Sequence, residues 1–173
     1  MCQDSSGALW VVAQHGALSR QQEGGWRLLS AKEGWTGGAA TCLASEPQGA
    51  VWIGTARNGL YRWQEGGFTH LGRTEGLASE TVQSLLYDSK GNLWIGLAPK
   101  GTVQRLHEGV FTTFPQPQEE FPVRTMVEDA VGHIWMVASD GRLLRLSGDA
   151  ITDETRGTLW PPICASRVSM AMF

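Results

Sequence analysis

The feature of this chain that most constrains its fold is an internal repeat of about 42 residues. A glycine, two residues and a tryptophan recur four times along the sequence. The four tryptophans are Trp10, Trp52, Trp94 and Trp135, which are 42, 42 and 41 residues apart. A fixed period of this length predicts an array of equivalent units that pack on one another.

Three further anchors recur in register with each tryptophan. An acidic residue lies three positions before the glycine of each tryptophan motif: Asp4, Glu46, Asp88 and Asp129. An arginine follows each tryptophan after a second glycine: Arg20, Arg62, Arg105 and Arg145. A Glu-Gly element comes next in three of the units, at 23–26, 65–68 and 108–111, with a weaker fourth copy at 148–151. We expect the acidic side chains to accept backbone N–H groups and the glycines to take a positive φ, so that each element closes a hairpin.

Apolar residues alternate with period two between these turns, as in Val82–Tyr87, and glycine returns too often for a helix of useful length. Each unit therefore predicts four short strands. An isolated four-stranded sheet cannot bury both faces, and radial stacking of such sheets gives a β-propeller. We predict an all-β, single-domain β-propeller with four-stranded antiparallel blades at about 1–40, 41–81, 82–122 and 123–167, and 168–173 as the first strand of the next blade. The sequence leaves two alternatives for the assembly of these blades: an arc of a larger ring, or a closed four-blade ring.

The recurring tryptophans have one fixed place in each predicted blade, on its second strand. A large ring there is expected to wedge between neighbouring blades, and its N–H is expected to find a backbone carbonyl. The three cysteines, Cys2, Cys42 and Cys164, form no close pair and are interpreted as packing residues.

Composition argues against several partners. The chain has 14 basic and 17 acidic residues, a net charge of −3, which gives no strong positive field for nucleic acid. No run is long and apolar enough to span a membrane, and the first residues lack the features of a signal peptide. The four histidines are scattered among the repeats, so neither a metal site nor a cofactor is expected.

The predicted blades place variable connections at one face, where the second strand leads to the third and the fourth leads to the next blade. Loops on a rigid scaffold are where recognition usually occurs. One residue in each second-to-third connection is a candidate ligand contact: His15, Arg57, Lys100 and Asp140. Trp35, in a connection between blades, is either an exposed stacking platform or a loop anchor.

The segment Val82–Gly96, together with the Gly59–Arg62 motif, resembles the two-component regulator propeller repeat. The resemblance covers nearly the whole chain, and residues 152–167 depart from it. It implies a sensory region, usually extracytoplasmic, placed ahead of a membrane span and a histidine kinase or another output domain. The matching glycines, aspartates and tryptophans are architectural, so no binding residue follows from it.

These observations predict a non-catalytic module that senses or binds a ligand. Its partner would be a small molecule, an oligosaccharide or a protein. A protein-binding scaffold is one alternative, and a lyase-like or glycosidase-like propeller enzyme is another. An open arc would also expose apolar blade faces, which predicts self-association.

Overall fold

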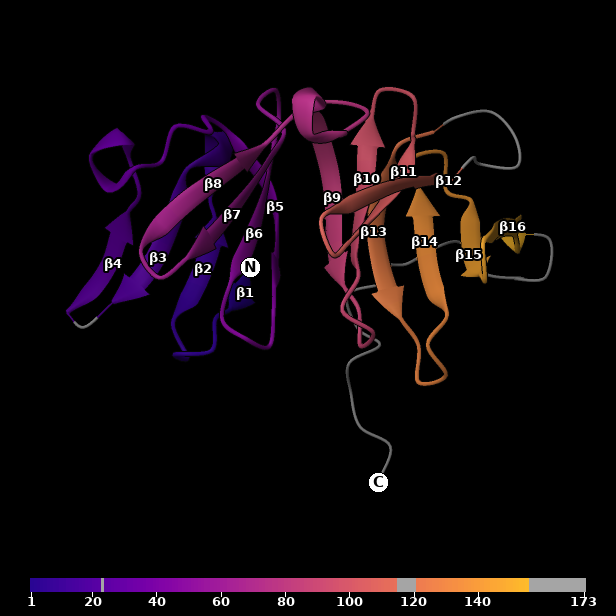
Figure 1. Cartoon of the computed structure of the whole chain (residues 1–173), viewed down its shortest axis with the longest axis horizontal. Coiled ribbons are helices and arrows are strands. Elements are labelled where there is room, and N and C mark those ends of the chain that lie inside the picture. The colour runs from indigo at the N-terminus through magenta and orange to yellow at the C-terminus, as the bar shows by residue number, and fades with distance from the viewer. Residues whose placement is uncertain (23, 115–120, 156–173) are drawn as a thin grey trace.

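The computed structural model describes residues 1–22, 24–114 and 121–155, and these residues form four antiparallel sheets of four strands each. Within each sheet the strands are ordered as in the sequence, so each sheet is one blade. The sheets stand side by side as an open arc (Figure 1). The predicted all-β architecture of antiparallel four-stranded blades is confirmed.

Blade 1 consists of β1 (Cys2–Gln3), β2 (Leu9–Val12), β3 (Leu18–Gln22) and β4 (Gly25–Leu28). Blade 2 consists of β5 (Ala40–Ser45), β6 (Val51–Thr55), β7 (Leu60–Gln64) and β8 (Gly67–Leu71). Blade 3 consists of β9 (Thr81–Tyr87), β10 (Leu93–Ala98), β11 (Val103–His107) and β12 (Val110–Phe114). Blade 4 consists of β13 (Val123–Glu128), β14 (Ile134–Ala138), β15 (Leu143–Ser147) and β16 (Ala150–Asp153). Three short 3-10 helices lie in the connections, η1 (Gln14–Gly16), η2 (Ala31–Glu33) and η3 (Arg73–Glu75).

Two strands begin one residue before the repeat boundaries predicted from the sequence, β5 at Ala40 and β9 at Thr81. The predicted extra strand at 168–173 lies outside the described residues, as does Cys164.

The hairpin turns form as the sequence predicts. In the turn between the first two strands of blade 3, Asp88 accepts backbone N–H groups from Lys90 and Asn92 at 2.9 and 2.8 Å. Gly91 has a φ of 80°, a conformation that costs glycine little. Glu65 and Gly66 both have positive φ, 50° and 86°, as the type I′ turn of a two-residue hairpin requires.

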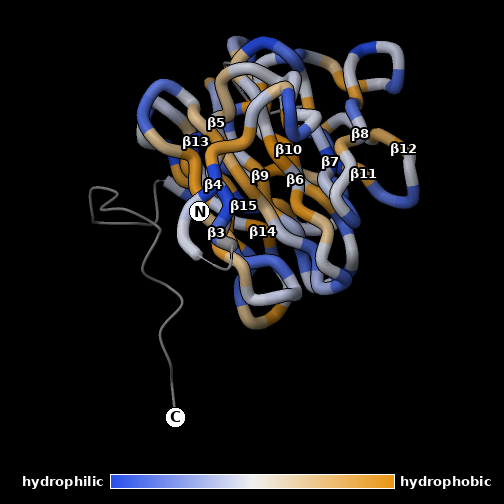
Figure 2. The backbone as a smooth tube through the Cα atoms, turned by 90° about the vertical axis from the view of Figure 1, so that its left-hand side faces the viewer, coloured by the Kyte–Doolittle hydropathy of each residue, from blue (hydrophilic) through white to orange (hydrophobic). Residues whose placement is uncertain are grey.

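Buried apolar side chains form three clusters in the described part of the chain, and each joins two adjacent blades. Trp10 packs with Val51 and Ile53, and the same arrangement repeats at the next two interfaces. The hydrophobic stretches of the chain accordingly lie in inner strands such as β6, β9 and β10 (Figure 2). The predicted wedge role is therefore confirmed for Trp10, Trp52 and Trp94, whose exposed fractions are 0%, 6% and 3%.

The prediction that these indoles donate to backbone carbonyls is wrong. Each indole Nε1 donates instead to the carboxylate of its own hairpin turn, six residues earlier in the chain. The pairs are Trp10 to Asp4 at 2.9 Å, Trp52 to Glu46 at 2.6 Å, Trp94 to Asp88 at 2.8 Å and Trp135 to Asp129 at 2.8 Å. An ionised acceptor gives a stronger hydrogen bond than a neutral carbonyl does.

An arginine completes this group in the first two blades. Arg20 is bonded to Asp4 at 2.9 Å and stacks 5.5 Å from the Trp10 ring. Arg62 relates to Glu46 and Trp52 in the same way. In blade 4 the equivalent Arg145 still lies over its tryptophan ring but pairs with Glu154 instead. In blades 1 and 2 the carboxylate of the first turn is therefore bonded to side chains of the second and third strands.

These carboxylates predict acid sensitivity. Burial raises the pKa of Asp4, but hydrogen bonds from Ser6, Trp10 and Arg20 outweigh it and lower the pKa from 3.8 to about 2. The Trp135 indole is the main cause of the low pKa of Asp129. A carboxyl group with a lowered folded-state pKa stabilises the fold above its unfolded pKa and loses that contribution as pH falls through the folded value.

We therefore expect the free energy of unfolding, measured by urea titration, to fall as the pH drops from about 4 to 2. The fall should be smaller in Asp4→Asn, which has lost one titrating group. Equal stabilities at both ends of this range would contradict the assignment.

Candidate functional site

The variable connections lie together on one edge of the arc. In Figure 1 the turn between β13 and β14 is at the lower edge, whereas η3 and the connection from β10 to β11 are at the upper edge. The lower edge is made of tight hairpins, so the upper edge offers the longer backbone segments on which recognition is usually built.

The connections between blades 1 and 2 and between blades 2 and 3 share one local design. In the first, Glu33 accepts from the backbone N–H and the hydroxyl of Ser30, and in the second Glu75 accepts from the backbone N–H of Gly72. Hydrogen bonds from Ser30 and then Arg27 lower the pKa of Glu33 to about 2. Each carboxylate thus holds a rigid single turn at the start of the connection.

Trp35 is the anchor of the first of these connections. It is only 7% exposed, its indole donates to the carbonyl of Gly38 at 3.1 Å, and its ring packs 4.9 Å from Tyr61. Leu77 is in the equivalent place in the next connection and is 2% exposed. Of the two roles predicted for Trp35, the loop-anchoring contacts are the ones present, and little of the ring is open to solvent for stacking.

A groove of about 470 Å³ lies where the η1 connection of blade 1 meets the segment that leads into β5. Its polar lining side chains are His15, Ser30 and Thr36, set among apolar ones that include Trp35. A Cβ at Gly16 would lie 2.6 Å from the Cα of Ala39, so only glycine lets the two segments lie this close. This contact brings His15 to the groove.

The five predicted site residues divide into two groups. His15 and Trp35 line the same groove. Arg57, Lys100 and Asp140 are exposed at the equivalent connections of blades 2, 3 and 4, and none of them lines it. The Asp140 carboxylate accepts from Arg142 Nε at 2.6 Å. Whether any of the five contacts a ligand stays a prediction.

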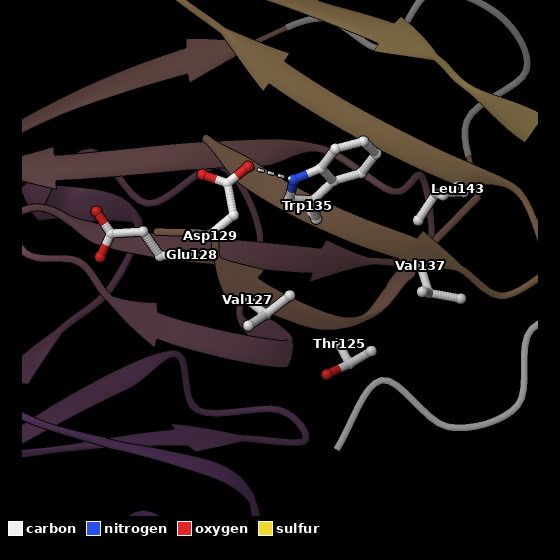
Figure 3. Close-up of a pocket in the computed structure, with 7 residues that line it drawn as sticks. All are labelled: Thr125, Val127, Glu128, Asp129, Trp135, Val137 and Leu143. Atoms are coloured by element: carbon white, nitrogen blue, oxygen red, sulfur yellow. Dashed lines mark hydrogen bonds between the residues drawn. The ribbon is translucent and has the colours of Figure 1, made fainter. Parts of the chain in front are cut away.

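A second concave surface was not predicted as a site. Its hollow has a volume of about 290 Å³ and lies on the face of blade 4 that points away from blade 3. The lining residues are Thr125, Val127, Glu128, Asp129, Trp135, Val137 and Leu143 (Figure 3). The sequence signal was present, because Trp135 has the register of the buried tryptophans.

The described residues were searched for metal ligands, a reactive thiol and a membrane-spanning helix. Within residues 1–22, 24–114 and 121–155, no three His, Cys, Asp or Glu side chains are grouped as metal ligands. Burial raises the pKa of the Cys42 thiol to about 12, which fits the packing role expected of it. No helix in those ranges has the length and apolar character needed to cross a membrane.

Blades with this strand order, joined through their faces by wedged tryptophans, define an arc of a β-propeller. Residues 76–98, which begin directly after η3 and cover β9 and β10, match the model of the two component regulator propeller. This match confirms the resemblance seen in the sequence, and the segment is a repeat of that kind.

Solved structures share this fold. The virginiamycin B lyase from Staphylococcus aureus matches with a TM-score of 0.74 and 15% identity, over 88% of this chain and 53% of the lyase. The extracellular domain of a hybrid two component system from B. thetaiotaomicron matches with a TM-score of 0.70 and 21% identity, over 84% of this chain and 21% of that one. YCF48 from Cyanidioschyzon merolae matches with a TM-score of 0.63 and 13% identity, over 85% of this chain and 53% of that one.

The chain thus spans about half the length of the lyase and about a fifth of the two component system domain. At these identities the similarity shows the fold alone. No curated protein is a significant sequence match.

Proposed function

We propose that this chain is part of an extracytoplasmic, non-catalytic sensing propeller of a two-component-type signalling protein, and that it binds its ligand at the upper edge of the arc. The observation that carries the proposal is the regulator propeller repeat at 76–98. The likeness in fold to extracellular domains of two component systems from B. thetaiotaomicron supports it.

The groove beside His15 is the proposed ligand site. Its volume of about 470 Å³ is in the range of small-molecule sites, and its lining combines an apolar floor with a few polar groups. A flat apolar surface would favour a protein-binding scaffold instead. A groove with an imidazole and two hydroxyl groups favours a small polar ligand such as an oligosaccharide.

An enzyme is the second candidate, and the similarity in fold to virginiamycin B lyase favours it. The two candidates differ in what happens to the ligand. A sensor returns its ligand unchanged, whereas a lyase or glycosidase converts it. A catalytically inactive virginiamycin B lyase from Staphylococcus aureus has been solved with quinupristin, so quinupristin is one probe. Mass spectrometry after incubation with quinupristin, or with each oligosaccharide tested for binding, distinguishes the two candidates, and conversion of either compound would contradict the sensor proposal.

The ligand site is tested with a panel of neutral and acidic oligosaccharides in a thermal-shift screen, followed by calorimetry on those that stabilise the chain. We expect His15→Ala to raise the Kd of such a ligand about tenfold, equivalent to about 1.4 kcal/mol, because a polar contact is lost. His107→Ala is the matched control, since His107 is an exposed histidine at the last position of β11 and does not line the groove. Equal weakening by both variants, or no stabilising sugar in the panel, would count against the proposed site.

A further inference from the structure

A third hollow, called here the outer groove, lies where the outer strands of blade 1 adjoin those of blade 2. Its volume is about 360 Å³, and its lining comes from β3, β4, β7 and β8 and from η2. The side chains that matter below are Arg20, Arg27, Lys32, Glu33, Trp63 and Phe68. The proposed ligand site beside His15 shares only Leu29 with it, so the two grooves are separate.

The side chains that line the outer groove offer hydrogen-bond donors but no free acceptor. Glu33 is the one carboxylate, and both of its oxygens are occupied, Oε1 by Arg27 and Oε2 by Ser30. Only Nη2 of Arg27 is used in this ion pair, and the side chain is 54% exposed, so further guanidinium N–H groups remain available. The Lys32 ammonium group forms no ion pair with a described residue. Charged donors without free acceptors favour an anionic ligand.

Two aromatic rings form the apolar part of the lining. Trp63 and Phe68 are a cross-strand pair on β7 and β8, and both are half-buried. The Trp63 ring packs 4.9 Å from the Trp10 ring and 4.6 Å from the guanidinium carbon of Arg20. The Phe68 ring packs 5.4 Å from the Trp35 ring. Both rings are therefore held by neighbours, and a flat apolar group can lie against them at little ordering cost.

Both free cations depart from the repeat. Arg27 lies opposite the repeated arginine of its blade, and the same position is threonine in the other three blades: Thr69, Thr112 and Thr152. Lys32 of η2 has the place of Thr74 in η3. A residue that only holds a blade together is expected to follow the repeat, so these two cations indicate a role particular to this groove.

The tryptophan of the outer groove is a third departure. Trp63 lies opposite Val51 as Leu106 lies opposite Leu93 and Leu146 lies opposite Ile134. Both leucines are buried, with exposed fractions of 6% and 5%. A leucine is thus enough to pack the other two seams between blades. The two cations and the one larger ring, which the repeat does not require, come together in one hollow.

We propose that the outer groove binds a small organic anion that carries a flat ring. The anionic group, a carboxylate, phosphate or sulfate, accepts hydrogen bonds from Arg27 and Lys32, and the ring lies against Trp63 and Phe68. A volume of about 360 Å³ is in the range of small-ligand sites. The chain as a whole has a net charge of −3, so attraction of anions is not a general property of its surface.

The test is a calorimetric titration of residues 1–173 with phenyl phosphate, phenyl sulfate and benzoate, which differ in the anionic group. Inorganic phosphate and phenol are the two halves of the first probe. We expect at least one of the three ring-bearing anions to bind, and to bind more tightly than either half. The order of the three probes identifies the preferred anionic group. Binding of none of them at millimolar concentration overturns the proposal.

The variants restore the residues of the repeat. Arg27→Thr should raise the Kd of the tightest probe about tenfold, because a hydrogen bond between charged groups is lost. Lys32→Thr removes an exposed charge and should raise it about two- to fivefold. Trp63→Leu should weaken the ring-bearing probe but not inorganic phosphate. Arg73→Thr is the matched control, because Arg73 is an exposed arginine of η3 outside the groove, and it should leave the Kd unchanged.

Circular dichroism establishes that each variant is folded, and Lys32→Thr tests the cationic side independently if Arg27→Thr is not. Equal weakening by Arg27→Thr and Arg73→Thr would mean that only general charge attracts the anion. Weakening by His15→Ala with full affinity in Arg27→Thr would place the anion in the groove beside His15. Either result overturns the outer groove as a site, and neither decides whether the groove beside His15 binds an oligosaccharide.

Discussion

Replacing Trp94 by alanine is expected to destabilise the fold by about 3 to 5 kcal/mol. The ring is 3% exposed, packs 5.2 Å from the Phe114 ring and belongs to the cluster that joins blades 3 and 4. Its removal leaves a cavity between two rigid sheets, and it also deprives Asp88 of a donor at 2.8 Å. Urea unfolding followed by far-UV circular dichroism measures the loss.

The matched control is Trp26→Ala in β4, where the indole is 55% exposed. Substitutions at such surface positions usually change stability by no more than about 0.5 kcal/mol. A loss below about 1 kcal/mol for Trp94→Ala would show that the blades are not packed through this ring.

Gly101→Ala is expected to have a comparably large effect, because its backbone is in close contact with the start of blade 4. A Cβ at Gly101 would lie 2.1 Å from the carbonyl oxygen of Phe121, which is backbone and does not rotate away. The φ of 71° adds a left-handed strain of about 1 to 2 kcal/mol, and forced displacement of packed atoms typically adds about 1 to 3 kcal/mol. We expect a total loss of about 2 to 5 kcal/mol in the same urea assay.

Gly109→Ala separates the two causes. Gly109 has a similar φ of 80°, but a Cβ there meets nothing within 4 Å. This variant should therefore lose only the strain of about 1 to 2 kcal/mol. Equal losses in the two alanine variants would mean that the contact between Gly101 and Phe121 contributes nothing.

The architecture could be predicted because the repeat fixes both the period and the position of each turn. The acidic residue, the glycine and the tryptophan of each unit determine one hairpin and one packed ring, and these are local consequences of local sequence. The indole partner was predicted wrongly although its signal was also local. Asp88 and Trp94 are six residues apart, and the same separation holds in all four repeats. The acidic residue of each unit was expected to bond only to backbone N–H groups of its own turn. With the carboxylate used in this way, a backbone carbonyl was the remaining acceptor for the indole.

The candidate site could be predicted only in part. The sequence identifies which connections share an edge, but the grouping of His15 with Trp35 depends on how closely two connections approach at Gly16. The burial of Trp35 could have been predicted by comparing Glu33–Trp35 with Glu75–Leu77, since a leucine at the same place has no stacking role. The exposure of the Trp135 face of blade 4 could not be predicted, because it depends on the neighbouring blade and not on the sequence of blade 4 itself.

The bonds of the turn carboxylate have a consequence for how such chains change in evolution. In blade 1, Asp4 contacts Trp10 and Arg20, all within one unit. A duplication or deletion of a whole unit therefore carries both members of every such ion pair together and strands no charge in the interior. The number of blades can then change by single genetic events, while each new junction needs complementary side-chain volumes and hydrogen bonds such as that from Thr41 Oγ1 to the carbonyl of Val82 at 2.7 Å.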